Sequence, residues 1–407
     1  MSSTETTFDG AETGAASART KLACRIVSAR LRRLSAGSIK VTLPCGGFVH
    51  HMGQKPGPAA ELHVHRWRAL PRIAIDGELG LARAYMDCDC SSPDIKALLA
   101  FGEANGGALR HALPKTPLAR FADRLHHWRR SNTRRGSRRN IAAHYDLGNE
   151  FYRRWLDRGM NYSSGIYDAP DRELEDAQTA KLERIAALLD VKPGHRVLEI
   201  GCGWGALAEH LVDRHGCAVT GLTLSAEQKA YADARLGPAA EFRLQDYRDL
   251  GGVYDRVASI EMLEAVGERY WPTYFHKLRH SLSGSGVAVL QVITIAEARY
   301  AAYRRQPDFI QRFIFPGGML PTAAIVRRQA EQVGLRVVSH ETFGQSYAWT
   351  LAEWRRRFVR SWPVLSGMGF DTRFKRMWEY YLAYCEVGFD RGAIDVGLFK
   401  LTPAPLR

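Results

Sequence analysis

An α/β fold with a mostly parallel sheet and helices on both faces is predicted from the pattern of the chain after about residue 173. Short apolar runs alternate there with longer segments of helical periodicity, which is typical of consecutive βαβ units. The first of these runs leads directly into closely spaced glycines. The first 110 residues follow a different pattern, and a chain of 407 residues is long enough for roughly two or three domains.

The N-terminal region is predicted to be a small α+β domain. Residues 38–43 and 61–67 alternate apolar and polar side chains, which is typical of half-buried strands. The Gly- and Pro-rich residues 53–60 predict a turn between these strands. Residues 68–86 and 91–105 have the pattern of helices.

The C-terminal region begins with residues 174–189, whose apolar side chains recur at the spacing of an amphipathic helix. A long helical and aromatic segment, residues 347–390, precedes the last strand and is predicted to cap an edge of the sheet. The β-rich runs that predict the sheet are residues 195–201, 217–223, 240–247, 254–262, 286–295, 335–343 and 394–403.

These patterns divide the chain into consecutive segments. Residues 1–20 are small and polar, lack the apolar core of a signal peptide and predict a disordered leader. Residues 21–115 form the N-terminal domain, and residues 116–140 form an Arg-rich linker. The main domain is expected to cover residues 141–407.

A cytoplasmic location is predicted. No window approaches the roughly 18 uninterrupted apolar residues of a membrane-spanning helix. The seven cysteines lack the spacing of a disulfide framework, which favours a reducing compartment. Cys88 and Cys90 lie near several histidines in the sequence, but a Cys-x-Cys without a second matched pair does not predict a metal site.

A net charge of +14 predicts a polyanionic partner, either nucleic acid or an anionic membrane surface. Eight arginines and Trp128 lie within residues 120–139. This segment is either a solvated linker or a membrane-surface segment in which each Arg contributes on the order of 1 kcal/mol. We expect peripheral association with anionic lipids at the inner face of the membrane. No nucleic-acid partner is expected, because the sequence contains no RNA-binding motif.

The strongest local motif is VLEIGCGWG, residues 197–205, in which a strand enters a glycine loop that precedes a helix. Such a loop brings backbone N–H groups near a ligand, and it also occurs in dinucleotide sites. A dinucleotide site calls for Asp or Glu about 20 residues later, where this chain has Gly221 and Thr223. Glu199 is unusual in a buried strand unless it accepts hydrogen bonds from a cation. We therefore favour S-adenosylmethionine, whose methionine moiety is cationic.

Residues 140–400 contain several long, ordered motifs. They are HYDLGNEFY from His144, MNYSSGIY from Met160, VLEIGCGWG from Val197, GLTLSAEQ from Gly221, LQDYRDL from Leu244, SIEMLEAVGERY from Ser259, FIFPGGMLP from Phe313 and YYLAYCEVGF from Tyr380. These motifs resemble the cyclopropane-fatty-acyl-phospholipid synthase family of S-adenosylmethionine-dependent methyltransferases, which includes mycolic acid methyltransferases. The resemblance implies a Rossmann-like class I methyltransferase domain with a helical cap, and the first 110 residues resemble the small, lipid-facing N-terminal domain of the longer bacterial members.

The resemblance implies a cofactor site that gathers residues from several loops. The segment after Gly221 falls where the family holds the ribose and methionine, and the segment after Leu244 falls where it holds adenine. The cofactor residues implied in this way are Tyr162, Ser163, Glu199, Gly201, Gly203, Gly205, Thr223, Leu224, Gln228, Asp246 and Tyr247.

The resemblance also implies a bicarbonate ion in the active site, held by Glu264, by the hydroxyl of Tyr347 and by backbone amides. Two positions depart from the family pattern, because Gln291 replaces the usual histidine and Ser164 replaces the usual cysteine. Ile293, close to Gln291 in the same segment, and Cys385, in the YYLAYCEVGF stretch, complete the implied catalytic set.

The implied reaction is methylation of a cis double bond in an unsaturated phospholipid acyl chain. Methylation of an alkene leaves a carbocation, and bicarbonate then removes a proton from the new methyl group to close a cyclopropane ring. Gln291 cannot share a proton as histidine does. Slower proton removal would favour a hydride shift and a methyl-branched product, so the sequence leaves ring closure and branching open.

Two other classes of function are compatible with parts of the sequence. A soluble-amine N-methyltransferase would share the methyltransferase domain, because some plant N-methyltransferases resemble this family, but it would not need the Arg-rich segment. An RNA methyltransferase or RNA-binding protein would explain the charge. The sequence also leaves a homodimer open.

Overall fold

The computed structural model describes residues 3–7, 14–106 and 147–405. Its contacts divide the chain into two units. One joins the described part of Met1–Ala122 to Trp362–Val387, and the other joins the described part of Asp123–Ser361 to that of Gly388–Arg407. The predicted Arg-rich linker, residues 116–140, lies outside the described residues.

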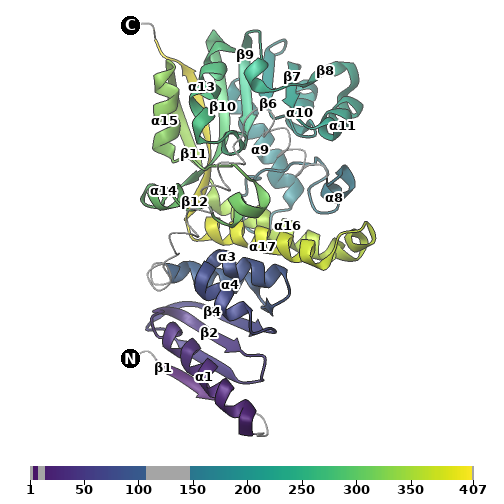
Figure 1. Ribbon diagram of the computed structural model, residues 1–407. Helices are drawn as coiled ribbons and strands as arrows, with labels where there is room; N and C mark the ends of the chain where they lie inside the picture. Colours follow the sequence, from purple (N-terminus) through teal and green to yellow (C-terminus); the bar gives the residue numbers. More distant parts are fainter. Residues whose placement is uncertain (1–2, 8–13, 107–146, 406–407) are drawn as a thin grey trace. The chain divides into compact units, whose positions relative to one another are not determined.

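The second unit contains a seven-stranded sheet (Figure 1). Its strands are β6 (Arg196–Ile200), β7 (Ala218–Thr223), β8 (Ala240–Leu244), β9 (Tyr254–Ile260), β10 (Leu282–Ile295), β11 (Leu335–Thr342) and β12 (Ile394–Pro403). The strand order is β11-β12-β10-β9-β6-β7-β8, and only β12 runs antiparallel to its neighbours. The α/β fold with a mostly parallel sheet is therefore confirmed, with a strand at each of the predicted runs.

Two apolar cores cover the two faces of this sheet. Val197 belongs to one core and the next residue, Leu198, to the other, because successive side chains of a strand point to opposite faces. One core includes residues of α9 (Leu174–Leu189), α10 (Ala206–His215) and α11 (Ala226–Leu236); the other includes α13 (Trp271–His280) and α15 (Ala323–Gln332). Helix α9 has the bounds that its apolar periodicity predicted.

The remaining helical segments of this unit are short, except for α16, of which only the part up to Ser361 belongs to this unit. They are α8 (Asn149–Arg153), η1 (Gly237–Ala239), η2 (Tyr247–Asp249), α12 (Leu263–Val266), η3 (Glu268–Tyr270), α14 (Glu297–Tyr303), η4 (Ile310–Ile314) and the first part of α16 (Gly344–Gly367).

The first unit is an α+β module, as predicted. Its sheet has the order β1-β3-β2-β4-β5. Its elements in the N-terminal region are β1 (Ser3–Thr7), α1 (Gly14–Leu31), β2 (Ala36–Thr42), β3 (Phe48–Met52), β4 (Lys55–Val64), α2 (Ala69–Asp76), α3 (Glu78–Met86), β5 (Cys90–Ser91) and α4 (Ile95–Ala104).

Two expectations for this region were wrong. Part of the predicted disordered leader is regular structure, because β1 pairs with the edge of β3 and α1 begins at Gly14; threonine-rich segments suit such edge pairing. Most of the predicted turn, residues 53–60, belongs to β4. A Cβ on Gly57 would lie 2.7 Å from the backbone nitrogen of Gly37, so glycine there permits close approach of two strands rather than a turn.

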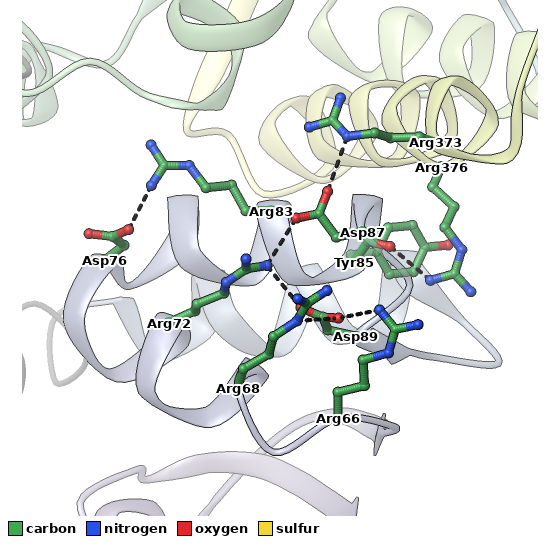
Figure 2. Close-up of polar contacts among 10 residues, drawn as sticks. All are labelled: Arg66, Arg68, Arg72, Asp76, Arg83, Tyr85, Asp87, Asp89, Arg373 and Arg376. Atoms are coloured by element: carbon green, nitrogen blue, oxygen red, sulfur yellow. Dashed lines mark hydrogen bonds and ion pairs between the residues drawn. The ribbon is translucent and has the colours of Figure 1, made fainter.

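The long helical segment near the C-terminus is confirmed as α16 and α17 (Thr372–Asp390), but its contacts differ from the expected domain boundary. The stretch Trp362–Val387 belongs to the first unit, not to a continuous main domain over residues 141–407. Arg376 explains part of this grouping, because its guanidinium donates to the carbonyl of Tyr85 at 2.8 Å (Figure 2). It also donates to the carbonyl of Cys90 at 2.8 Å. Arg373 adds an ion pair with Asp87 at 3.1 Å.

A buried carboxylate organises the same region of the first unit. Asp89 is fully buried and accepts hydrogen bonds from the guanidinium groups of Arg66, Arg68 and Arg72 (Figure 2). A charge in this position is tolerated because each oxygen has cationic partners.

Among the described residues, no helix is long and apolar enough to cross a membrane, and no three His, Cys, Asp or Glu side chains gather as metal ligands.

Candidate active site

A pocket lies at the carboxyl ends of β6, β7, β8 and β9 and is lined by the residues that follow these strands. Strand β6 has β9 on one side and β7 on the other, so the chain order reverses at this point in the sheet. Ligands of open α/β sheets bind at such a switch point. Segments from residues 160–163 and 315–318 complete the lining.

The glycine loop after β6 has a backbone that favours glycine. Gly201, Gly203 and Gly205 have φ values of 84°, 52° and 85°, in the region that L side chains rarely adopt. Gly205 immediately precedes α10. A Cβ on Gly203 would meet no atom within 4 Å, and Gly203 lines the pocket, so the loop leaves room for a ligand against its backbone.

Glu199 lies in β6, lines the pocket and is almost fully buried. Burial raises the pKa of its carboxyl to about 8, while nearby Lys181 acts in the opposite direction. Its Oε2 has no hydrogen-bond partner among the described residues. A buried carboxylate oxygen without a partner is costly unless a cation binds to it, and this oxygen therefore fits the ammonium group of S-adenosylmethionine.

Lys181 is a pocket residue that the sequence analysis missed. It lies on α9, is buried, and its Nζ donates to Ser163 Oγ at 2.9 Å and to Asn161 Oδ1 at 3.2 Å. Burial lowers its pKa to about 8, against the opposing effect of neighbouring carboxylates. A lysine on the apolar face of a predicted helix was the signal that could have found it.

The loops after β7 and β8 supply further residues of the pocket lining. Thr223 Oγ1 donates to Gln228 Oε1 at 2.8 Å. The carboxylate of Asp246 accepts from the guanidinium of Arg248 at 2.9 and 2.7 Å, and Arg248 also lies over the ring of Tyr247. Arg248 is a second pocket residue that the sequence analysis missed.

Most of the residues predicted to hold the cofactor therefore lie together. Gly205 adjoins the pocket as the residue before α10 rather than lining it. Tyr162 packs among Tyr152, Trp155 and Trp354 with ring centroids 5.4–5.5 Å apart. The predicted cofactor residues that line the pocket are Tyr162, Ser163, Glu199, Gly201, Gly203, Thr223, Leu224, Gln228, Asp246 and Tyr247.

Three of the predicted catalytic residues converge, but on a residue that was not predicted. Glu261 Oε1 accepts from the backbone N–H of Ser164 at 2.9 Å and from Gln291 Nε2 at 2.7 Å. Glu261 Oε2 accepts from the hydroxyl of Tyr347 at 2.6 Å. Glu261 follows β9 and lines the pocket.

Glu264 lies three residues further along, in α12, and makes a different contact. Its Oε1 accepts from the backbone N–H of Ile293. Burial, together with the neighbouring charge of Glu261, raises the pKa of Glu264 to about 8. Cys385 lies on α17 in the first unit, and the lining of the pocket does not include it.

The glycine loop, the strand acid and their place at the switch point of a mostly parallel sheet define a class I S-adenosylmethionine-dependent methyltransferase. The family model described as mycolic acid cyclopropane synthetase matches residues 132–399. The chain belongs to this family.

Two curated relatives extend the similarity into the N-terminal region. The tuberculostearic acid methyltransferase UfaA1 of Mycobacterium tuberculosis is 39% identical over 357 residues, which cover 83% of this chain and 82% of the relative. The cyclopropane-fatty-acyl-phospholipid synthase of Escherichia coli is 36% identical over 349 residues, covering 84% and 87%. Mycolic acid cyclopropane synthase CmaA1, solved with SAH and CTAB, has a TM-score of 0.61 and 29% identity over 65% of this chain and 97% of that chain.

Proposed function

We propose that the protein transfers the methyl group of S-adenosylmethionine to a cis double bond in an unsaturated acyl chain of a phospholipid. The observation that carries this proposal is a half-buried carboxylate with three hydrogen-bond donors, Glu261, on the wall of the pocket. Alkene methylation needs a proton acceptor that is shielded from water, because the product cation must lose a proton. The two curated relatives, a tuberculostearic acid methyltransferase and a cyclopropane-fatty-acyl-phospholipid synthase, support the same substrate class.

The chain's own groups have distinct parts in this mechanism. When bound, S-adenosylmethionine supplies an electrophilic methyl group. The glycine loop would allow the cofactor to approach the backbone closely, and Glu199 would accept from its ammonium group. Tyr162 and Phe315 line the pocket and offer aromatic faces that attract positive charge. The burial of the site excludes water from the cation until a proton is lost.

Analysis of the lipids tests the proposal directly. Expression of the chain in a host that makes monounsaturated phospholipids should produce acyl chains one methylene group heavier than their parents, as measured by mass spectrometry. Cyclopropane and methylene-branched products have the same mass, so NMR of the isolated fatty acids must distinguish them. A purified enzyme that methylates soluble amines and leaves every acyl chain unchanged would favour the N-methyltransferase alternative.

We extend the proposal to the membrane surface through the Arg-rich segment, residues 120–139. Changing Arg129, Arg130, Arg134 and Arg135 to Gln should weaken binding to anionic vesicles by up to about 4 kcal/mol and reduce its salt dependence. The matched control replaces the same residues by Lys, which keeps the charge and should keep most of the binding. Co-sedimentation with anionic and zwitterionic vesicles measures both. Equal binding of wild type and the Gln variant would contradict a membrane role for these arginines.

A further inference from the structure

The groups expected to hold a bicarbonate ion donate to carboxylates of this chain. The backbone N–H of Ser164, the amide of Gln291 and the hydroxyl of Tyr347 all bond to Glu261, at 2.6–2.9 Å. The remaining expected amide, that of Ile293, donates to Glu264. A carboxylate presents the same planar pair of acceptor oxygens as bicarbonate. These residues therefore do not fit an added bicarbonate ion, because a side chain already satisfies them.

We propose that the carboxylate of Glu261 is the proton acceptor of the reaction and that the enzyme does not use bicarbonate. This inference rests on the proposed function, alkene methylation. Glu261 lines the pocket between the end of β9 and α12, so its carboxylate is at the wall of the site where the methyl group would be delivered.

The backbone at Glu261 supports a functional role for this side chain. Its φ of 51° is in the left-handed region, which costs a residue with a Cβ about 1–2 kcal/mol relative to glycine. Its N–H donates to the carbonyl of Gln291 at 2.8 Å, which fixes the turn after β9. Backbone strain and a half-buried carboxylate both oppose folding, and this combination is typical of residues retained for chemistry.

Electrostatics assigns different protonation states to the two neighbouring carboxyls. Burial raises the pKa of Glu261, but its three donors favour the ionised form. Glu264 has a backbone donor, and burial together with the charge of Glu261 raises its pKa to about 8. A pKa of about 8 favours the proton of the pair on Glu264 at neutral pH, and the three donors to Glu261 favour its ionised form, which is the form that can accept a proton.

The proposed step balances without a further reactant. Methyl transfer places a positive charge on the alkene carbon next to the methylated one. A Glu261 oxygen then takes a proton from the new methyl group, and the electron pair of that C–H bond forms the third bond of the cyclopropane ring. If a hydride first shifts from the methylated carbon to its cationic neighbour, loss of the same methyl proton forms a methylene group instead. In both cases Glu261 ends protonated and releases the proton to solvent.

The test compares wild type with two variants in carbon-dioxide-depleted buffer, with and without added bicarbonate. Glu261→Gly suits the left-handed backbone and leaves the three donors open to a free anion. Glu261→Gln is the matched control, because it fills the same space without a basic oxygen. Methylated lipid is measured by mass spectrometry, and calorimetry with S-adenosylmethionine checks that each variant is folded and binds cofactor.

Wild type should turn over at the same rate with and without bicarbonate. Both variants should lose about 10²-fold or more in turnover, the scale of a positioned proton acceptor, and only Glu261→Gly should regain activity when bicarbonate is added. A wild-type enzyme that needs bicarbonate, or a Glu261→Gln variant that retains normal turnover, overturns the proposal. A wild-type enzyme that methylates no acyl chain under either condition contradicts the proposed function itself, which is a separate result.

Discussion

Replacement of Gly203 by valine should abolish binding of S-adenosylmethionine and, with it, methyl transfer. Gly203 has a φ of 52°, and its missing Cβ faces open space beside the pocket, so a branched side chain would occupy the volume that the cofactor needs. The open space means that the variant meets no packing clash, although a left-handed valine costs about 1–2 kcal/mol. Calorimetric titration with S-adenosylmethionine measures the loss.

Gly216→Val is the matched control for this substitution. Gly216 also has a left-handed backbone, with a φ of 64°, and its missing Cβ has only ordinary contacts with Pro193 at 3.6 Å or more. It ends α10, and the pocket lining does not include it. The control should lose a similar amount of stability in thermal unfolding and still bind the cofactor. Normal cofactor affinity in Gly203→Val would mean that the loop after β6 is not the cofactor loop.

The sequence predicted most of the parallel sheet because its strands are continuous apolar runs separated by helices of clear periodicity. That local signal places β6 and α9 with little dependence on the rest of the chain. It failed at residues 53–60, where the glycines and prolines of a tight strand pairing look the same as those of a turn. It also could not show that Trp362–Val387 packs with the N-terminal region, because that contact depends on Arg376 and backbone carbonyls nearly 300 residues away.

The sequence predicted only part of the candidate site, because contacts between distant segments cannot be read from local motifs. Motif matching selected Ser164, Gln291 and Tyr347, but neither spacing nor composition showed that all three would donate to one side chain. Glu261 was within a quoted motif, only three residues before Glu264, and its role became visible only when β9, β10 and α16 were placed together. Lys181 was hidden in the same way, because its acceptors are 18 and 20 residues earlier in the chain.

Replacement of Glu199 by glutamine should weaken S-adenosylmethionine binding by about 10- to 100-fold at pH 8, because a hydrogen bond to a charged group is worth about 1.5–3 kcal/mol. The wild-type affinity should also rise with pH between about 5 and 8. Burial raises the pKa of Glu199 to about 8, so the free protein carries a proton there that must leave before the carboxylate can pair with the ammonium group.

The stability of the free protein should change in the opposite direction over the same pH range. The pKa of Glu199 is higher in the folded protein than in the unfolded chain, so its contribution to stability is complete below about pH 4.5 and is lost as the pH rises through about 8. Lys181 has a folded pKa that is lowered to about 8. Its shift makes the free protein more stable only as the pH rises from about 8 toward 10.5.

Thermal unfolding between pH 5 and 8 should therefore show a growing difference in melting temperature between cofactor-bound and free wild type. In Glu199→Gln this gap should be small and should lose the part of its pH dependence that Glu199 supplies. An affinity that falls with pH in wild type, or that is unchanged by the substitution, would exclude Glu199 as the partner of the cofactor's ammonium group.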